Sequence, residues 1–313
     1  MRSGILVIDK ATDWTSHDVV NKLRGIFGQK KIGHTGTLDP MATGVLPVCL
    51  GRATKLADYV AAGDKTYEAE MTLGLETDTE DSTGTVTRRA TVNVSDTALQ
   101  SVMTSFRGPQ LQVPPMYSAI RIGGKRLYEI ARTGRTVERP ARPITIHALD
   151  LQERSAEKIR FTVTCSKGTY VRSLCRDMGR ALGCLAVMSA LRRTRVGQFT
   201  LADAVTMETA RERGPGQPLL AMDAALSAMP ILTARDETTK RVNNGNPLAF
   251  SEVSEQERAA AAETGTLFRM YRADGFFVGL YERQDTRLKP KTILMETGGR
   301  NHGVASPDNR FKI

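Results

Sequence analysis

Asp39 is the side chain whose position in this sequence is most suggestive of chemistry, and it lies in the segment GHTGTLDP at residues 33–40. A residue that precedes proline is restricted to extended backbone, so Pro40 holds the Asp39 carboxylate in a defined direction. Gly36 and Gly44 allow tight turns and the close approach of a large ligand. The loop by itself leaves two interpretations open: a catalytic carboxylate, or an Asx-turn that caps local amides, which is the commoner role of loop aspartates.

Five other side chains have types and positions suited to a reaction site, although each also has an ordinary structural explanation. A loop histidine, a strand tyrosine and a strand-end lysine are usually solvated or packed at the edge of a core. A strand-to-helix corner, SKGTY, supplies a second tyrosine and, two residues later, an arginine that could equally lie on the surface. The five residues are His34, Tyr67, Lys10, Tyr170 and Arg172. Their joint occurrence is what requires an explanation.

Several classes of reaction site lack their motifs here. The sequence has no Gly-x-x-x-x-Gly-Lys-Ser/Thr and no Gly-x-Gly-x-x-Gly, so phosphate-loop and dinucleotide sites have no support. Gly-x-Ser-x-Gly and the zinc-deaminase pattern are missing too. None of the cysteines forms a Cys-x-x-Cys pair or lies near a histidine at ligand spacing; they are Cys49, Cys165, Cys175 and Cys184. We therefore expect buried free thiols and no metal site.

The chain of 313 residues has a formal net charge of +10, which favours a polyanionic partner. No apolar run reaches the roughly 18 residues that a membrane-spanning helix requires. The apolar stretch near the N-terminus is too short for the core of a signal peptide. We expect a cytoplasmic protein that does not associate with membranes.

Two segments concentrate the positive charge. Residues 107–143 contain eight basic side chains against two acidic ones, and residues 167–195 contain seven against Asp177 alone. Because a solvated surface usually mixes both signs, these segments indicate a surface for phosphates, although charge alone leaves an ordinary solvated surface as an equal alternative. The candidate RNA contacts in them are Lys125, Arg126, Arg132 and Arg176.

Hydrophobic periodicity predicts the elements that must position these side chains. Residues 4–8 are typical of a buried strand. Thr15 or Ser16 caps a helix with apolar residues at helical spacing, and Gly28 ends it. The glycine-rich segment 33–44, which contains Asp39, has little periodicity and is predicted to be a loop.

Strict alternation of apolar and polar residues predicts half-buried strands at 66–73 and 159–165. An amphipathic helix is predicted at 96–106. The helix after the second strand carries one stripe of arginines, which are Arg172, Arg176 and Arg180. Because strands and helices interleave without the short rhythm of parallel βαβ units, we predict an α+β domain on a largely antiparallel sheet.

The remaining segments complete the expected domain organisation. Residues 107–143 are rich in proline and glycine and are predicted to form a mobile, RNA-binding excursion rather than core. The catalytic domain is expected to span residues 1–212. Asp274-Gly275, between two apolar runs, predicts a hairpin within a small β-rich domain at 229–296. Residues 297–313 are predicted to be a disordered tail.

Long ordered motifs extend along most of the chain. They are LVIDKATDWTSHDVV, GHTGTLDPMATGVLPVCLGRATKL, KTYEAEMTLGLETDTEDSTG, VPPMYSAIRIGGKRLYEIARTG, CSKGTYVRSLCRDMG with a downstream ALRR, and the later RVNNGNPL and RLKPKTIL. In this order they resemble the TruB family, the bacterial tRNA pseudouridine-55 synthases, over residues 4–296. The resemblance implies a pseudouridine synthase fold, with a mainly antiparallel mixed sheet and flanking helices, and a C-terminal RNA-binding domain of the PUA type.

The resemblance also implies roles for single residues. Asp39 matches the catalytic aspartate of the family, and Arg172 matches the arginine that pairs with it. Tyr67 matches a tyrosine that stacks on the target base and to which a proton transfer is assigned. His34 matches the histidine that enters the T-loop and supports the flipped nucleotide. Three further pocket positions are Tyr170, Lys10 and Leu191.

The implied reaction breaks the N1–C1′ bond of a uridine, turns the base and joins C5 to C1′. Nothing is oxidised and no group leaves, so we expect no cofactor and no metal. Flipping the base costs a few kcal/mol, which phosphate contacts and stacking on Tyr67 offset. Arg172 is expected to lower the pKa of Asp39 and keep it ionised. The expected partner is the T-arm of tRNA, bound by a monomer.

Three first steps remain open, namely attack of Asp39 on C6, attack on C1′, and removal of the C2′ proton, which the resemblance favours. Two other functions also stay open. One is a non-catalytic RNA-binding or RNA-folding protein on the same scaffold, and a folding role is compatible with catalysis. The other is a cofactor-free glycosidase or nucleosidase, whose second carboxylate would come from the acidic cluster Glu76, Asp78, Glu80 and Asp81.

Overall fold

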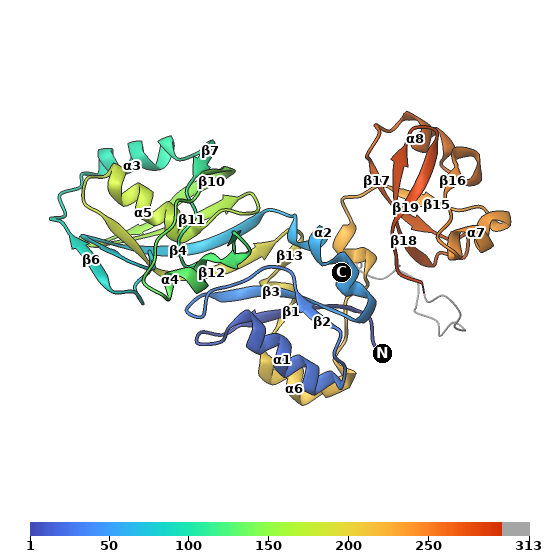
Figure 1. Ribbon diagram of the computed structural model, residues 1–313, viewed down its shortest axis with the longest axis horizontal. Helices are drawn as coiled ribbons and strands as arrows, with labels where there is room; N and C mark the ends of the chain where they lie inside the picture. Colours follow the sequence, from blue (N-terminus) through green and yellow to red (C-terminus); the bar gives the residue numbers. More distant parts are fainter. Residues whose placement is uncertain (296–313) are drawn as a thin grey trace. The chain divides into compact units, whose positions relative to one another are not determined.

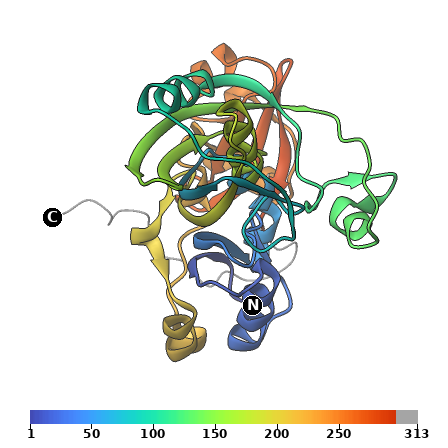
Figure 2. The same cartoon turned by 90° about the vertical axis from the view of Figure 1, so that its left-hand side faces the viewer.

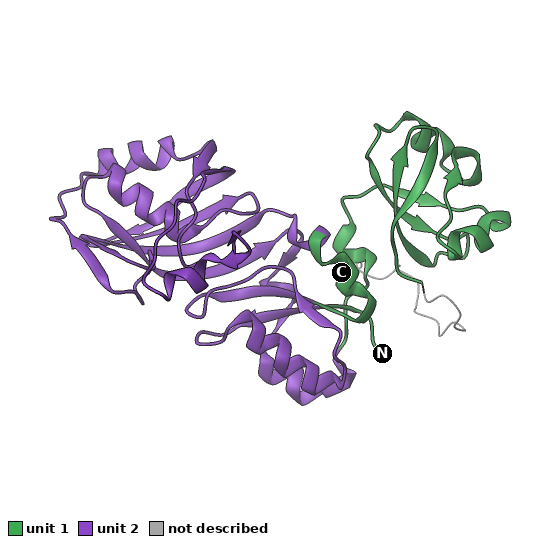
Figure 3. Ribbon diagram, viewed as in Figure 1, with its two compact units in different colours: residues 1–5, 49–58, 218–313 green, residues 6–48, 59–217 purple. Residues whose placement is uncertain are grey.

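The computed structural model describes residues 1–295, so the tail predicted at 297–313 lies outside the described residues. The chain forms two units (Figure 3): one comprises residues 6–48 and 59–217, the other residues 1–5, 49–58 and the chain from residue 218. A single division between residues 212 and 229 was expected, whereas two N-terminal segments group with the C-terminal part.

Backbone and side-chain hydrogen bonds explain that grouping. Ile5 and Leu220 exchange backbone N–H···O bonds of 2.9 and 2.8 Å. Arg52 donates to the carbonyl of Leu294 at 3.0 Å. These bonds join residues more than 200 positions apart, so no local pattern in the sequence announces them.

The larger unit is built on a mixed sheet, which among the described residues has ten strands in the order β14-β1-β3-β12-β4-β11-β10-β7, with β2 paired to β3 and β13 to β12. Its strands are β1 (Gly4–Lys10), β2 (Ile32–His34), β3 (Thr43–Leu50), β4 (Lys65–Leu73), β7 (Gly108–Gln112), β10 (Arg142–Arg154), β11 (Lys158–Cys165), β12 (Ala186–Val196), β13 (Phe199–Thr200) and β14 (Ala204–Val205). The pairs β4–β11, β4–β12, β10–β11, β7–β10 and β12–β13 are antiparallel, and β3–β12 and β1–β14 are parallel. The predicted α+β class with a largely antiparallel sheet is confirmed.

The alternation predicted for the two central strands is confirmed by burial. The buried side chains are Tyr67, Ala69, Met71 and Leu73 on β4, and Ile159, Phe161, Val163 and Cys165 on β11. The exception is Glu70, which is buried on the opposite face of β4. Lys158 and Arg160 of β11 bind its two oxygens at 2.8 and 3.0 Å, and these ion pairs compensate for the loss of water.

Helices flank this sheet (Figures 1 and 2), apart from α4, which lies in a segment that projects from it. They are α1 (Ser16–Phe27), α2 (Ala57–Ala61), α3 (Asp96–Ser105), α4 (Leu127–Ala131), α5 (Val171–Ala181) and α6 (Met207–Arg213). Thr15 caps α1 in a reciprocal capping box with Asp18, and Gly28 ends it with a φ of 60°, as predicted. In Figure 1, α3 and α5 lie side by side, with α5 packed against β12 and α3 against β10, and α1 lies beside α6.

The prediction that residues 107–143 form one excursion outside the core is wrong at both ends. Residues 108–112 form the edge strand β7, which pairs with residues 142–146 of β10. The excursion proper, residues 113–141, contains the short hairpin β8 (Arg121–Ile122) and β9 (Lys125–Arg126), followed by α4. Figure 2 shows it, in green, projecting from the sheet. The proline- and glycine-rich composition indicates an irregular segment. It does not reveal that the residues at both ends of the segment pair as strands, because that pairing depends on tertiary contacts.

Between β4 and α3 lies a second small hairpin, β5 (Leu75–Thr77) and β6 (Val86–Arg89). Its first strand leads into the acidic turn at residues 76–81. Glu80 in this turn has a φ of 65°, which is uncommon for a residue with a side chain.

The smaller unit carries a five-stranded sheet in the order β15-β17-β18-β19-β16. The strands are β15 (Ile231–Thr233), β16 (Leu248–Ala249), β17 (Leu267–Tyr271), β18 (Phe277–Gln284) and β19 (Arg287–Ile293), with helices α7 (Thr239–Asn243) and α8 (Gln256–Ala261). The hairpin predicted at Asp274-Gly275 joins β17 to β18, and Gly275 adopts the φ of 79° that the turn requires.

All four cysteines are free and buried, as expected. Within residues 1–295, no helix combines the length and the apolar character that a membrane span requires.

Two helical glycines predict opposite effects on stability. A Cβ at Gly179 of α5 would overlap the backbone nitrogen of Ala186 and force the helix away from β12, whereas a Cβ at Gly25 of α1 meets no atom within 4 Å. We expect Gly179→Ala to lower the free energy of unfolding by about 1–3 kcal/mol. Gly25→Ala is expected to be neutral or to raise it by up to about 1 kcal/mol, because alanine favours helix. Urea unfolding of both variants measures this, and equal stabilities would contradict the proposed contact.

Candidate active site

Buried polar contacts hold the loop that carries Asp39. The hydroxyl of Ser16 accepts the N–H of Leu38 at 2.9 Å and donates to the Leu38 carbonyl at 3.2 Å. The ammonium group of Lys10 donates to the carbonyl of Pro40 at 3.1 Å. A turn closes between the Asp39 carbonyl and the N–H of Ala42 at 3.0 Å. Both neighbours of Asp39 in the chain are therefore fixed by side chains from β1 and α1.

Arg172, near the start of α5, binds both carboxylate oxygens of Asp39. Its Nε lies 2.9 Å from Oδ2, and one terminal nitrogen donates to Oδ1 at 3.3 Å. The carbonyls of Thr79 and Tyr117 accept from the terminal nitrogens at 2.9 and 2.8 Å. The guanidinium is thus oriented independently of Asp39. The Arg172 side chain is 6 % exposed and that of Asp39 34 %, so the carboxylate is the partner that faces solvent.

The pKa of the Asp39 carboxyl is raised above its usual value, because burial disfavours the charged form. Arg172 and Lys10 oppose this shift, and the nearby carboxylate of Asp81 adds to it. Arg172 therefore acts in the expected direction, but burial outweighs it. A carboxylate with a raised pKa is a stronger base than an ordinary aspartate once it is ionised.

Tyr67 lies on β4 directly across from Arg193 of β12, and its side chain is buried. Burial raises the pKa of Tyr67, and the charge of Arg193 opposes that rise. The phenol is therefore protonated at neutral pH and can donate a hydrogen bond. Leu191, on the same strand as Arg193, pairs with Ala69 and is half-buried.

Tyr170 caps the N-terminus of α5, where a single side chain holds its backbone. Gln112 of β7 accepts the N–H of Tyr170 at 2.8 Å and donates to its carbonyl at 3.1 Å. Burial raises the pKa of the Tyr170 hydroxyl, and the charge of Asp39 contributes to the shift, as it does for Tyr67. Both tyrosines thus lie within electrostatic range of the carboxylate.

His34 ends β2 and is half-buried. Its Nδ1 accepts the N–H of Gly36 at 3.4 Å. Burial, followed by the charge of Arg193, lowers the pKa of His34, so the imidazole is neutral near pH 7. A neutral ring with Nδ1 occupied presents its Nε2–H as a donor.

The prediction that Arg176 contacts RNA is contradicted by its burial. The side chain is 9 % exposed and its guanidinium is paired with Glu80 and, at 2.8 Å, with Asp177. The neighbouring Arg180 binds Glu76 at 2.5 Å. The predicted stripe of arginines on one face of a helix is confirmed, but that face meets the acidic turn of residues 76–81.

The same pairing removes two carboxylates from the glycosidase alternative. Glu76 and Glu80 are engaged by arginines. Asp81 accepts bonds from the hydroxyls of Thr79 and Thr83 at 2.8 and 2.6 Å and lies 3.7 Å from Arg172. The acidic turn therefore holds α5 in place through ion pairs with its arginines.

The predicted RNA contacts in the excursion lie on a different part of the unit. Lys125, Arg126 and Arg132 are exposed. Arg126 donates to the hydroxyl of Tyr128 at 2.9 Å. The guanidinium groups of Arg126 and Arg132 lie 5.8 and 5.4 Å from the centre of the Tyr128 ring. They form a cationic surface built around one aromatic ring.

Three residues that position the site were not identified in the sequence. The sequence predicts Ser16 only as a helix cap, Gln112 as part of the excursion, and Arg193 only as one charge of a basic segment. Each is nearly fully buried, at 2 %, 4 % and 2 % exposed. Their hydrogen-bond partners are backbone groups, so the identity of the partner residue gives no signal in the sequence. Only the ALRR motif, which contains Arg193, points to one of the three.

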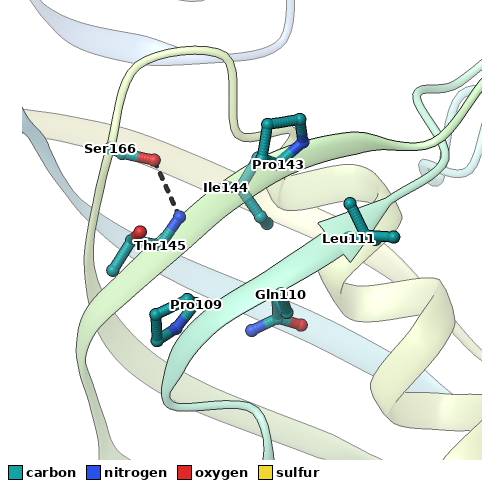
Figure 4. Close-up of a pocket in the computed structure, with 7 residues that line it drawn as sticks. All are labelled: Pro109, Gln110, Leu111, Pro143, Ile144, Thr145 and Ser166. Carbon is teal, nitrogen blue, oxygen red and sulfur yellow. Dashed lines mark hydrogen bonds between the residues drawn. The ribbon is translucent and has the colours of Figure 1, made fainter.

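A shallow hollow of about 360 Å³ lies elsewhere on the unit, between β7, β10 and the turn before α5 (Figure 4). Its lining residues are Pro109, Gln110, Leu111, Pro143, Ile144, Thr145 and Ser166. None is a charged group or a residue of the Asp39 site. Within residues 1–295, no cluster of three or more His, Cys, Asp or Glu side chains gathers as a metal site would.

Comparison with known families and relatives gives consistent matches. The family model described as TruB family pseudouridylate synthase, N-terminal domain, matches residues 24–171, and that of the tRNA pseudouridylate synthase B C-terminal domain matches residues 172–213. The tRNA pseudouridine synthase B of Bacillus licheniformis is 43 % identical over 312 residues, covering 95 % of this chain and 99 % of its own. Those of Bacillus subtilis and Burkholderia mallei are 41 % and 42 % identical, over 95 % and 93 % of this chain and 99 % and 97 % of their own.

Solved structures share the fold. A Cbf5-Nop10-Gar1 complex contains a chain with a TM-score of 0.71 and 26 % identity, covering 93 % of this chain and 85 % of that one. A chain of an H/ACA RNP bound to a substrate RNA containing 2′-deoxyuridine has a TM-score of 0.71 and 24 % identity, covering 94 % of this chain and 86 % of that one. The second likeness concerns the fold alone.

The burial of Lys10 leads us to expect that its contribution to the stability of the fold depends on pH. Its ammonium group is fully buried and donates to the carbonyls of Ala11, Trp14 and Pro40. Burial lowers its pKa to about 8, although Asp39 opposes the shift. An unfolded lysine titrates near 10.4, so between these values the unfolded chain binds more protons and the contribution of Lys10 to stability rises with pH.

The measurement compares wild type with Lys10→Met. The difference in free energy of unfolding, wild type minus variant, is expected to increase from about pH 8 to about pH 10.4. Lys65 is an independent second case, because burial also lowers its pKa to about 8. Lys65→Met should therefore give a slope of the same sign, and parallel stability curves for wild type and Lys10→Met would contradict the assignment.

Proposed function

Because the chain belongs to the TruB family of pseudouridine synthases, we propose that Asp39 is the carboxylate with which it converts the T-loop uridine of tRNA, position 55, to pseudouridine. The chain is a pseudouridine synthase that isomerises uridine in tRNA, as the family match and the full-length relatives establish. The position of the uridine and the roles of single residues belong to the proposal.

The observation that carries the proposal is the pairing of Asp39 with Arg172. A partly exposed carboxylate is bound at both oxygens by a buried guanidinium that the carbonyls of Thr79 and Tyr117 orient. An Asx-turn needs no such partner, because its carboxylate is satisfied by local amides. Arg172 favours the ionised form of the carboxylate against the effect of burial, and the carboxylate is the member of the pair that faces solvent, where a flipped nucleotide would arrive.

The surrounding residues suit a base taken out of its stack. Tyr67 offers a ring for stacking, which is worth about 1–3 kcal/mol per base in RNA and DNA complexes. We assign His34, Tyr170 and Leu191 to the walls of the site on the basis of the family resemblance, and Lys10 holds Pro40. The raised pKa of Asp39 favours a role as general base, which is consistent with removal of the C2′ proton as the first step.

The other parts of the chain supply affinity for RNA. The excursion presents Lys125, Arg126 and Arg132 to phosphates. The five-stranded sheet of the smaller unit is proposed to be a PUA-like RNA-binding domain, in a monomeric enzyme of the bacterial cytoplasm. The substrate is then held over several sites, while the chemistry needs only the residues around Asp39.

Asp39→Asn tests the proposal directly. The amide preserves shape but neither accepts a proton nor attacks carbon, so pseudouridine formation in purified tRNA should fall below detection while tRNA affinity stays within about twofold of wild type. Asp150→Asn is the matched control, because Asp150 is an exposed carboxylate paired with Arg107 at 2.9 Å. It should retain wild-type activity. An active Asp39→Asn enzyme would remove Asp39 from the chemistry.

The charge of Arg172 is expected to set the position of the acid limb of the pH–rate profile. The reaction needs ionised Asp39, so the rate falls as the pH drops through the raised pKa of that carboxyl. Arg172→Gln removes a charge that lowers this pKa, and the acid limb should therefore move to higher pH. Arg172→Lys keeps the charge and should keep the limb near that of wild type, at a lower rate because a single nitrogen cannot bind both oxygens. Coincident limbs for Arg172→Gln and wild type would contradict the electrostatic role.

A further inference from the structure

Arg193 of β12 is a buried cation whose partners are not carboxylates. Its side chain is 2 % exposed and is among the largest fully buried side chains of the described residues. Within residues 1–295, no acidic group lies within ion-pair distance of it. A buried charge without a counter-charge is expensive unless its donors are satisfied, so the acceptors of Arg193 define what it does.

Those acceptors are backbone carbonyls at both ends of the Asp39 loop. The Nε donates to the carbonyl of Val45 at 2.8 Å. The two terminal nitrogens donate to Gly36 at 3.2 Å and to Thr37 at 3.5 Å. One rigid guanidinium thus joins the entry and the exit of the loop.

The backbone of Arg193 is equally close to this loop. Arg193 pairs in register with Gly44 across the parallel β3–β12 contact, and a Cβ on Gly44 would overlap the Arg193 carbonyl. Gly44 has a φ of 102°, which disfavours any side chain there. The loop is therefore held against Arg193 by both its side chain and its main chain.

On the other edge of β12, Arg193 lies across from Tyr67 of β4. Its charge acts on the titration of Tyr67, His34 and Lys10. A single side chain therefore connects Tyr67, which is proposed to stack on the base, with the loop that carries the carboxylate and with two further groups of the site.

We propose that Arg193 is a positioning residue, which fixes the Asp39 loop relative to Tyr67 and Arg172 so that the carboxylate and the aromatic ring meet the same nucleotide. This inference rests on the proposed role of Asp39. Arginine is required because its planar fork reaches three carbonyls in fixed directions, whereas lysine offers one nitrogen on a flexible stem. Arg193 itself touches no substrate, and it acts on the rate of the chemical step rather than on RNA affinity.

Arg193→Lys and Arg193→Gln test the proposal, with Arg195→Lys as the matched control. Arg195 lies on the same strand but donates to Thr66 and Gly197, away from the loop. We measure the single-turnover rate at saturating tRNA, the dissociation constant for tRNA, and the folded fraction by thermal unfolding. Both Arg193 variants should lose roughly tenfold to a hundredfold in rate, since small misplacements cost that much, with the dissociation constant within about twofold of wild type. Arg195→Lys should behave as wild type.

Amide hydrogen exchange reports the loop directly. In Arg193→Lys, the N–H groups of Leu38 and Ala42 should exchange faster, because their acceptors Ser16 and Asp39 no longer hold a fixed loop. The amide of Val163, in the centre of the sheet, should keep its wild-type protection. A purely structural role would raise exchange at all three positions together.

The outcomes separate this inference from the proposed function. An active Asp39→Asn enzyme overturns the function and the inference with it. An inactive Asp39→Asn enzyme beside fully active Arg193 variants overturns the inference alone. The inference also fails if the rate falls only in proportion to the folded fraction, if affinity rather than rate is lost, or if neither Arg193 variant folds.

Discussion

The ion pair between Asp39 and Arg172 is the interaction on which the rest of the site depends. Arg172 reaches it from α5, and the carbonyls that orient Arg172 belong to Thr79 and Tyr117. Three segments far apart in the sequence therefore converge on one guanidinium. Removing either partner would leave the other charge without compensation in a largely buried setting, which is among the costliest single changes a site can undergo. The pair is thus a constraint on the fold as well as on the chemistry.

The arginine stripe of α5 extends this constraint along the helix. Arg176 and Arg180 bind Glu80 and Glu76 of the acidic turn, so the turn that carries the Thr79 carbonyl is fixed by the same helix that it helps to orient. Much of the charge in residues 167–195 is therefore paired with acidic side chains of the protein itself. The cations left for RNA are those on exposed segments such as the excursion, where Arg126 and Arg132 flank the Tyr128 ring. Net charge counts both kinds together and cannot tell them apart.

The elements with local signals were predictable, and the contacts between distant elements were not. Alternation on β4 and β11, the capping box of α1 and the hairpin at Asp274-Gly275 depend on residues close together in the chain. The i, i+4, i+8 spacing placed the arginines of α5 on one face but did not say that this face meets an acidic turn. The strand β7, the backbone clamp by Gln112 and the grouping of residues 1–5 with the C-terminal unit arise from pairing across long separations. The motif resemblance assigns Asp39, Tyr67 and Arg172 to one site, whereas no local pattern in the sequence links these three residues.

Burial shifts the pKa values of the charged groups in the site towards neutral pH, upwards for the acid and downwards for the base. It raises the pKa of Asp39 and lowers that of Lys10 to about 8. A carboxylate gains strength as a base in this way, but it becomes useless if it is protonated at the working pH. Arg172 and Lys10 resolve the conflict, since their charges limit the rise without cancelling it. The loop can occupy so polar and so buried a position because Ser16, Lys10 and Arg193 satisfy its backbone carbonyls. The basicity of Asp39 therefore depends on the surroundings of the loop. A substitution of Ser16, Lys10 or Arg193 should change the position or the pKa of the carboxylate.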